Sequence, residues 1–341
     1  MIKMRVAING FGRIGRLFLR SALGQPELDI VAINDLGDLE NLAYLFKYDT
    51  VYGRYSEKVE AASGVLTVKG KKIKVLQVKD PGALPWKDLK VDLVVEATGF
   101  FESYEKAKVH IEAGAKRVVI TAPAKDADGT EEKTVLMGVN EGELRTAVLT
   151  SNGSCTTNAA SPVIQVMSEN PGIAKAVLNT VHGYTATQNL VDGPVKSGPD
   201  FRRGRAAAQN IVPSTTGAAI AVTRAIPSLS GKFDGIALRV PIATGSIADI
   251  TFLAKRKVTV EEVNDTFRKA SKEPRWQGIL TVSEDQLVSS DVIGEPYGSI
   301  VDLNFTKVID GDLVKVLAWY DNEAGYVATL IKHILAIAAI S

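Results

Sequence analysis

At 341 residues the chain is about twice as long as a typical domain, and its hydrophobic (45%) and charged (23%) contents are those of an ordinary globular protein. Its 40 basic and 39 acidic residues leave a formal net charge of +1, which gives no reason to expect a nucleic-acid or membrane partner. One cysteine excludes an internal disulfide, and with no signal-peptide pattern at the N-terminus the sequence predicts a cytoplasmic protein.

The first half of the sequence alternates short apolar runs with helical patterns. Such alternation is typical of βαβ units and predicts an α/β domain with a parallel sheet. The expected strands are MRVAIN, LDIVAIN, VDLVVEATG and KRVVITAP, and the expected helices are RIGRLFLRSAL, LENLAYLFKY and SYEKAKVHIEAG.

The pattern changes at about residue 151, where longer strand candidates follow one another. They are IAKAVLNTVH, GIALRVPI, SIADITFLAKRK and DLVKVLAWYD, and two helical patterns fall between them. Strand runs with helices set apart predict an α+β domain with its helices on one face of the sheet. Residues 192–205, rich in Gly, Pro and charge, are expected to form a long functional loop.

The stretch NGFGRIG places Gly10, Gly12 and Gly15 in G-x-G-x-x-G spacing between a predicted strand and a predicted helix. Asp35 ends the next predicted strand, at the spacing that the dinucleotide-binding fingerprint requires. Such glycines let backbone N–H groups approach a pyrophosphate at a helix N-terminus. The alternative is a tight turn without a ligand, with Asp35 a solvated strand end. Because Asp35 disfavours a 2′-phosphate and DLGDLEN holds no Lys or Arg, the sequence predicts NAD rather than NADP.

The only cysteine, Cys155, lies in the polar stretch SNGSCTTN at the start of a predicted helix. A thiol at a helix N-terminus has a lowered pKa and is a nucleophile near neutral pH. His182 ends a predicted strand, whereas His110 and His333 lie in helical patterns, where surface or packing positions are expected. Cys155 and His182 suit a nucleophile–base pair. Spacing alone leaves open whether they meet, are unrelated, or whether Cys155 is a packed apolar residue.

A thiolate beside a nicotinamide suggests the oxidation of an aldehyde. Attack by sulfur gives a thiohemiacetal, loss of hydride leaves a thioester, and a second nucleophile releases the acyl group. Guanidinium groups and a helix start are the candidates for binding phosphate. They are Arg202, Arg203 and Arg205 in FRRGR, Arg239 in ALRVP, and Thr216–Gly217. A solvated position is the alternative for each arginine, and the apolar setting of Arg239 disfavours it.

Six motifs occur in the order and near the spacing of one known family: NGFGRIGR, SNGSCTTN, TVHGYTATQ, STTGAA, LRVP and WYDNEAGY. With them the sequence resembles the phosphorylating glyceraldehyde-3-phosphate dehydrogenases over essentially its whole length. The resemblance implies NAD-dependent oxidative phosphorylation of D-glyceraldehyde 3-phosphate by inorganic phosphate, in glycolysis or gluconeogenesis, in a homotetramer without a metal site.

The resemblance also implies how the chain is divided. Residues 1–151 are expected to form a Rossmann-type NAD-binding domain, and residues 152–321 an α+β catalytic domain with a mostly antiparallel sheet. A C-terminal helix at 322–341 is expected to pack back onto the first domain.

The resemblance assigns roles to individual residues. Cys155 is expected to be the nucleophile and His182 the base. The expected cofactor contacts are Gly10, Gly12, Arg13, Ile14, Gly15, Asp35, Lys79, Thr121 and Asn322, the last at the nicotinamide carboxamide. The expected contacts to substrate and inorganic phosphate are Ser154, Thr156, Thr185, Arg203, Thr216, Gly217 and Arg239. Among these, Thr185 and Arg239 fall to the substrate's own phosphate, and Arg202 stays open as an alternative to Arg203.

Two features depart from the family pattern. Gly153 stands where the family usually has Ala, and the loop 192–205 is a few residues longer around VKSGPD. In the family this loop lies against a neighbouring subunit's cofactor, so its length bears on the tetramer and on the choice between NAD and NADP. Leu36 and Pro194 match the members that use NAD.

Three other functions fit parts of the pattern. Erythrose-4-phosphate dehydrogenase, which releases its thioester to water, matches HGYTATQ and STTGAA less well. Aspartate-semialdehyde dehydrogenase matches SNGSCTTN and WYDNEAGY poorly. A catalytically silent nucleotide-binding regulator is expected to have lost Cys155 or His182, and both are present.

Overall fold

The computed structural model describes residues 3–195 and 199–340 and divides into two compact units. The N-terminal unit comprises the chain up to Val135, Glu141–Gly153 and the residues from Leu330 onward. The second unit, called the catalytic unit after the catalytic domain that the sequence predicts, comprises Leu136–Asn140 and Ser154–Thr329. Residues 196–198 of the predicted long loop lie outside the described residues, as do residues 1–2 and residue 341 at the ends of the predicted domains.

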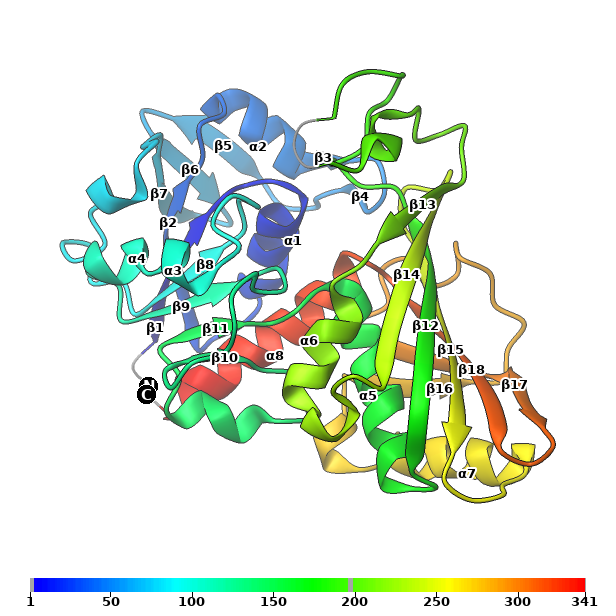
Figure 1. Cartoon of the computed structure of the whole chain (residues 1–341). Helices are drawn as coiled ribbons and strands as arrows, with labels where there is room; N and C mark the ends of the chain where they lie inside the picture. The colour runs from blue at the N-terminus through cyan, green and yellow to red at the C-terminus, as the bar shows by residue number, and fades with distance from the viewer. Residues whose placement is uncertain (1–2, 196–198, 341) are drawn as a thin grey trace. The chain divides into compact units, whose positions relative to one another are not determined.

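The N-terminal unit is built on a nine-stranded sheet in the order β10-β11-β9-β8-β1-β2-β7-β6-β5 (Figure 1). Pairs from β10 through β7 are parallel, which confirms the predicted parallel sheet, and the edge made by β7, β6 and β5 is antiparallel. The strands are β1 (Met4–Asn9), β2 (Leu28–Asn34), β5 (Val59–Ala62), β6 (Val65–Val68), β7 (Lys71–Leu76), β8 (Leu93–Glu96), β9 (Arg117–Ile120), β10 (Glu132–Thr134) and β11 (Leu149–Ser151), with a separate hairpin of β3 (Tyr48–Asp49) and β4 (Gly53–Arg54).

Helices connect these strands. They are α1 (Arg13–Ala22), α2 (Leu39–Lys47), α3 (Tyr104–Ala107) and α4 (Val109–Glu112), with 3₁₀ turns at Pro81–Ala83 and Glu141–Arg145. The C-terminal helix α8 (Ala324–Ile340) clusters with the N-terminal unit from Leu330 onward, and its His333 Nε2 lies 2.9 Å from Thr150 Oγ1 on β11.

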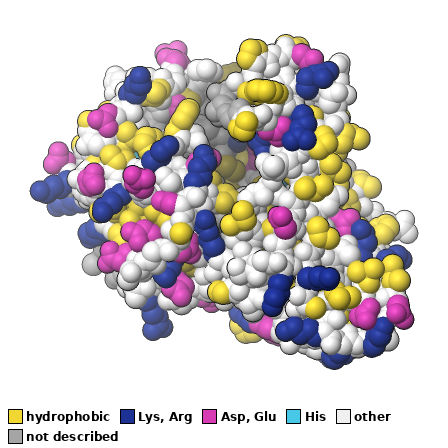
Figure 2. All heavy atoms as spheres, in the orientation of Figure 1, with side chains coloured by type: hydrophobic (Ala, Val, Ile, Leu, Met, Phe, Trp, Pro, Cys, Tyr) yellow, Lys and Arg dark blue, Asp and Glu magenta, His cyan; other side chains and the backbone are white. Residues whose placement is uncertain are grey.

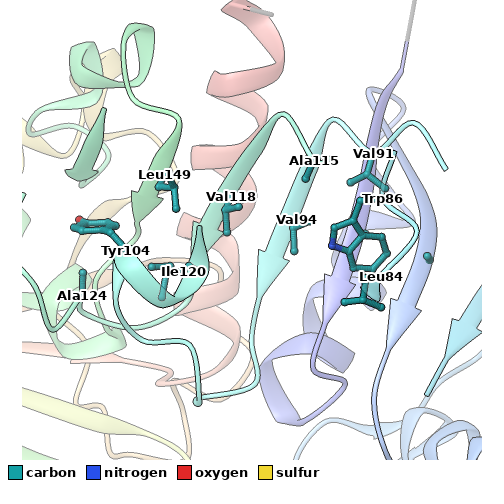
Figure 3. Close-up of a cluster of buried hydrophobic side chains, with 13 residues drawn as sticks. Leu84, Trp86, Val91, Val94, Tyr104, Ala115, Val118, Ile120, Ala124 and Leu149 are labelled. Carbon is teal, nitrogen blue, oxygen red and sulfur yellow. The ribbon is translucent and has the colours of Figure 1, made fainter. Parts of the chain in front are cut away.

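Apolar strand residues form the core of this unit. Figure 3 shows Val94, Val118, Ile120 and Leu149, from β8, β9 and β11, in one buried cluster that also holds Trp86. Strands of parallel sheets are apolar along nearly their whole length because both faces are covered. This explains why short continuous apolar runs such as VDLVVE and RVVI predicted strands correctly.

The catalytic unit holds a seven-stranded sheet in the order β13-β14-β12-β15-β18-β17-β16. Only the pairs β12–β14 and β16–β17 are parallel, so the predicted mostly antiparallel sheet is confirmed. The strands are β12 (Ile173–Gly183), β13 (Val212–Thr215), β14 (Phe233–Val240), β15 (Ser246–Ala254), β16 (Leu280–Ser283), β17 (Ser299–Ile309) and β18 (Leu313–Tyr320).

One face of this sheet is covered by helices. They are α5 (Cys155–Glu169), α6 (Ala218–Ala225) and α7 (Val260–Ala270), with 3₁₀ turns at Phe201–Gly204, Pro227–Leu229 and Pro274–Trp276. Contacts of α5 with both other helices and with β12, β15, β17 and β18 place all three on one side of the sheet, as predicted. On the opposite face Val177 and Ile236 are each 54% exposed.

The surface agrees with the composition. Figure 2 shows Lys and Arg side chains interspersed with Asp and Glu, as the near-zero net charge predicts. No helix within residues 3–195 or 199–340 is both long enough and apolar enough to cross a membrane.

The two histidines that the sequence placed in helical patterns are both fully buried, so they occupy packing positions. Burial lowers the pKa of His333 to about 4, and the charge of Arg117 adds to this effect, while the Val135 backbone opposes it. Between about pH 4 and the ordinary histidine pKa, His333 is therefore protonated in the unfolded chain and neutral in the folded chain.

We expect the free energy of unfolding to fall as the pH drops from about 6.5 toward 4, because more protons bind to the unfolded state in this window. One such group contributes a slope of up to about 1.4 kcal/mol per pH unit. His333→Gln removes this contribution. Urea unfolding at neutral and mildly acidic pH should therefore show that the free energy of unfolding falls less with decreasing pH in the variant than in the wild type. An equal pH dependence of the free energy of unfolding in the two proteins would contradict the lowered pKa of His333.

Candidate active site

The glycines of NGFGRIG have different roles in the turn from β1 to α1. Gly10 has φ +97°, and a Cβ on it would lie 2.6 Å from the backbone of Ala97. A Cβ on Gly15 would lie 2.1 Å from the carbonyl oxygen of Gly10. A Cβ on Gly12, by contrast, meets nothing within 4 Å among the described residues. Gly10 and Gly15 thus permit close packing, and Gly12 keeps the start of α1 open.

A pocket of about 270 Å³ lies at the carboxyl ends of β1 and β2. Its lining includes Gly10, Gly12, Asp35 and Lys79. In an open α/β sheet, ligands bind at this edge, where the strand order reverses on either side of β1. The start of α1, with its first backbone N–H groups and positive dipole end, suits a phosphate. The pocket and the open position at Gly12 therefore fit a dinucleotide.

Asp35, Arg13 and Thr121, which are also expected to contact the cofactor, are held by other residues of the N-terminal unit. The Asp35 carboxylate accepts hydrogen bonds from the N–H groups of Phe11 (2.7 Å) and Gly37 (2.8 Å), which hold it beside the glycine turn. Arg13 and Ile14 open α1, and the Arg13 guanidinium forms an ion pair with Asp49. Thr121 binds the carbonyl oxygen of Glu96 through both its N–H and its Oγ1.

The catalytic unit brings Cys155 and His182 together. Ser154 caps α5 by accepting a hydrogen bond from Thr157 N–H, and this cap fixes Cys155 as the first residue of the helix. His182 lies near the end of β12 and is buried. Cys155 Sγ is 3.3 Å from His182 Nε2, within reach for proton transfer. Of the alternatives left open by spacing, the structure thus shows a pair.

Arg239 lies against the far side of the His182 ring. Residues 182 and 239 are register partners in the parallel pair β12–β14, so their side chains start side by side. Arg239 Nη1 is 2.7 Å from His182 Nδ1 and 3.2 Å from the carbonyl oxygen of Gly183, which itself is 2.6 Å from Nδ1. A guanidinium only donates and a carbonyl only accepts, so the two neighbours favour opposite tautomers of the imidazole.

Burial acts on the cysteine and the histidine in opposite directions. Burial raises the pKa of Cys155 and outweighs both the Arg239 charge and the hydrogen bonds involving Thr156, so the predicted lowering of the thiol pKa is wrong. Burial and the Arg239 charge together lower the pKa of His182 to about 3, opposed by the Gly183 carbonyl. A low-dielectric site disfavours both charged forms. The pair therefore rests as a thiol and a neutral imidazole.

Two of the phosphate-binding candidates, Arg203 and Thr185, are linked through Thr187 in the same unit. Arg203 donates to Thr187 Oγ1 (3.1 Å) and Ser214 Oγ (2.7 Å), and Thr187 Oγ1 is 2.9 Å from Thr185 Oγ1. Arg202 instead forms an ion pair with Asp200. Thr216 Oγ1 accepts from Ala218 N–H, and Gly217 is the N-cap of α6.

No separate signal in the sequence indicated Tyr320, the first of the two tyrosines in the motif WYDNEAGY. Its hydroxyl lies 2.9 Å from Thr156 Oγ1 and 2.7 Å from Thr180 Oγ1, and its ring meets the His182 ring edge-on. Burial and the nearby Cys155 raise the pKa of Tyr320, so it stays protonated. Thr156 thus directs its hydroxyl to Tyr320. Two residues further on, Asn322 Oδ1 accepts from Ser246 Oγ (2.9 Å) and the Gly245 N–H.

Comparison with known proteins decides the family. The glyceraldehyde 3-phosphate dehydrogenase NAD-binding domain matches residues 4–104, and the C-terminal domain of the same enzyme matches residues 154–322. A glyceraldehyde-3-phosphate dehydrogenase of Clostridium pasteurianum is 48% identical over 332 residues, 96% of each chain. That of Clostridium acetobutylicum is 47% identical over 341 residues, 99% of each chain. The chain belongs to the glyceraldehyde-3-phosphate dehydrogenase family.

Membership in this family makes the chain an NAD-dependent oxidoreductase, which confirms the predicted cofactor. The Bacillus subtilis protein named glyceraldehyde-3-phosphate dehydrogenase 2 is similar over comparable length, with 46% identity over 340 residues and 98% of each chain. The matched NAD-binding domain contains the glycine turn, Asp35 and Lys79.

We expect Gly12→Ala and Gly15→Ala to separate ligand binding from folding. Gly15→Ala forces a Cβ against the Gly10 carbonyl and should lower the free energy of unfolding by about 1–3 kcal/mol. Gly12→Ala meets no described atom and should change stability by less than about 0.5 kcal/mol, yet weaken NAD binding. Chemical denaturation and calorimetric NAD titration measure the two effects, and an unaltered stability for Gly15→Ala would contradict the close contact.

Proposed function

We propose that the chain oxidises and phosphorylates D-glyceraldehyde 3-phosphate to 1,3-bisphosphoglycerate through a thiohemiacetal and a thioester on Cys155. The observation that carries the proposal is the 3.3 Å approach of Cys155 Sγ to His182 Nε2 beside Arg239. The names of the relatives support the same substrate. Glycolysis or gluconeogenesis in the cytoplasm is the corresponding setting.

Binding of the aldehyde uses the charge of Arg239 and the hydroxyl of Thr185. A phosphate that accepts a hydrogen bond from Arg239 draws the guanidinium away from His182 Nδ1. The Nδ1–H can then donate to the Gly183 carbonyl, 2.6 Å away, which leaves the lone pair on Nε2. In this proposal the substrate's own phosphate selects the basic tautomer of His182.

The first covalent step joins sulfur to the aldehyde carbon. His182 Nε2 takes the proton from Cys155 Sγ, the S–C bond forms, and the carbonyl π electrons move to oxygen. His182 returns the proton to that oxygen, which gives a neutral thiohemiacetal. The 3.3 Å approach of Sγ to Nε2 supports a direct transfer of this proton.

Oxidation needs a base and a hydride acceptor. His182 Nε2 removes the hydroxyl proton of the thiohemiacetal while its carbon loses a hydride, and a thioester remains on Cys155. NAD, when bound, supplies the oxidant, because its nicotinamide accepts that hydride. The contacts of Asn322 Oδ1 with Ser246 and Gly245 orient its amide, which supports the proposed hold on the carboxamide.

Release of the product uses the cluster around Arg203. An oxygen of inorganic phosphate attacks the thioester carbon, the C–S bond breaks, and the proton that His182 carries returns to sulfur. Ser154, Thr156, Thr216 and Gly217 are the further proposed contacts. Arg203 donates hydrogen bonds to Thr187 and Ser214, whereas Arg202 is paired with Asp200. This difference supports Arg203 as the phosphate ligand.

We also propose a homotetramer, with domain limits at residues 1–151 plus the C-terminal helix and at 152–321. The exposed apolar residues Val177 and Ile236, on the sheet face away from the helices, support burial against a second copy. A groove of about 840 Å³ on the catalytic unit includes Val177 and Leu253 in its lining. Sedimentation equilibrium of the wild-type chain tests the assembly.

Erythrose-4-phosphate dehydrogenase activity and a silent nucleotide-binding regulator are the alternatives. The deciding experiment is NAD reduction by glyceraldehyde 3-phosphate, with and without inorganic phosphate. The proposal expects repeated turnover only with phosphate. Turnover of erythrose 4-phosphate without phosphate favours the first alternative, and NAD binding without turnover favours the second.

We expect Cys155→Ser to abolish hydride transfer and to leave NAD affinity largely intact, because the covalent bond forms on sulfur while the dinucleotide pocket lies in the other unit.

His182→Asn should slow the hydride step by roughly 10²–10⁴-fold, the usual effect of losing a general base. Stopped-flow absorbance measures both. A serine variant that retains most turnover would rule out the covalent mechanism.

We expect Arg239→Ala to lower kcat/KM for glyceraldehyde 3-phosphate by roughly ten- to a hundredfold, since a charge-assisted contact contributes about 1.5–3 kcal/mol. Unphosphorylated glyceraldehyde should lose far less. Arg203→Ala should spare the hydride burst and slow acyl transfer to phosphate. Equal losses on both aldehydes for Arg239→Ala would show that this residue supports the fold and not the substrate's phosphate.

A further inference from the structure

Three buried polar residues end three neighbouring strands of the N-terminal sheet. Asn9 ends β1, Asn34 ends β2 and Glu96 ends β8, and Asn9 is the register partner of both others. All three are at most 5% exposed. Polar side chains so deeply buried are costly unless each one is hydrogen-bonded, so their partners define what the cluster does.

The hydrogen bonds of the cluster have a definite direction. Trp86 Nε1 lies 3.1 Å from His110 Nδ1, and an indole N–H only donates. His110 Nδ1 is therefore an acceptor, and its proton resides on Nε2. His110 Nε2–H then donates to Glu96 Oε2, 3.0 Å away. Both histidine and tryptophan are fully buried, so the direction is set by protein groups.

Glu96 is saturated with donors. Oε2 accepts from His110 and from Asn9 Nδ2 (2.6 Å), and Oε1 accepts from the N–H and Oγ1–H of Thr98. The Asn9 amide is thereby held in one orientation, with its oxygen turned toward Asn34 Nδ2 at 2.8 Å. Asn34 in turn accepts from Val78 N–H. This chain of hydrogen bonds thus links Trp86 to the residues at the strand ends, and Glu96 is the acceptor on which its donors converge from both sides.

The far end of this chain is the lining of the dinucleotide pocket. Asn9, Asn34, Val78 and Thr98 all line it. We propose that Trp86, His110 and Glu96 form a positioning unit that orients the amides and the Thr98 turn of this pocket and so sets the affinity for NAD. The inference rests on the proposed placement of the dinucleotide at the glycine turn. It assigns a role to a histidine and a tryptophan that the proposed chemistry at Cys155 does not use.

The test compares NAD dissociation constants by calorimetry on the intact chain. His110→Leu removes the donor to Glu96 and should weaken NAD binding by about 5- to 150-fold, the range for losing a buried hydrogen bond and leaving its partner unsatisfied. His110→Gln offers an amide N–H to Glu96 and should recover most of the affinity. Trp86→Phe deletes the indole N–H and should weaken NAD binding by about two- to fivefold; it carries the test if His110→Leu fails to fold.

His333→Leu is the matched control, because His333 is equally buried in the same unit but contacts Thr150 and not the pocket residues. It should leave NAD affinity within twofold of the wild type. In the His110 variants the KM for NAD should rise, while kcat at saturating NAD and the rate of Cys155 alkylation stay unchanged. A structural role alone predicts the same small effect for His110→Leu and His333→Leu, and that outcome would overturn the proposal.

Asp35→Asn, measured in parallel, separates the two levels of inference. If it leaves NAD affinity unchanged, the dinucleotide does not bind at the glycine turn and both proposals about this pocket fail. If it weakens binding while His110→Leu and Trp86→Phe do not, only the positioning unit is rejected.

Discussion

The parallel register of β12 with β14 is the constraint on which the catalytic geometry depends. It makes His182 and Arg239 direct neighbours, so the guanidinium reaches the imidazole without any long loop to place it. A shift of one residue in either strand would turn one of the two side chains to the opposite face of the sheet. The Ser154 cap starts α5 at Cys155, whose Sγ, the proposed nucleophile, lies beside the other ring nitrogen.

In both units, polar residues are brought together near the carboxyl ends of neighbouring parallel strands. In the N-terminal unit, Asn9, Asn34 and Glu96 sit side by side because they end adjacent parallel strands. In the catalytic unit, His182 and Arg239 sit side by side near the ends of its longest parallel pair. Parallel strands present their carboxyl ends at one edge, and polar side chains gathered there meet without long connections. Both sites are thereby held by backbone hydrogen bonds rather than by surface loops.

Burial sets the chemical state of the Cys155–His182 pair. At the thiol it keeps the proton on sulfur and leaves His182 neutral, so the pair is ready for proton transfer rather than already charged. At Glu96 four donated hydrogen bonds compensate for burial. The donors to Glu96 also fix the orientation of the Asn9 amide beside it, and orientation is what binding requires.

Residue type and local spacing predicted the glycine turn with Asp35, the parallel sheet of the first half and the change in pattern at about residue 151. The resemblance to the family supplied the mostly antiparallel sheet of the second half and the roles expected of Cys155 and His182. Tertiary structure alone decided that Arg203 rather than Arg202 faces Thr187 and Ser214, that Tyr320 bridges Thr156 and Thr180, and that Trp86 and His110 reach Glu96. It also reversed the expected direction of the thiol pKa. Contacts between residues far apart in the chain, and the desolvation of the Cys155 thiol, leave no periodic signal in the sequence, because they arise only when the elements pack.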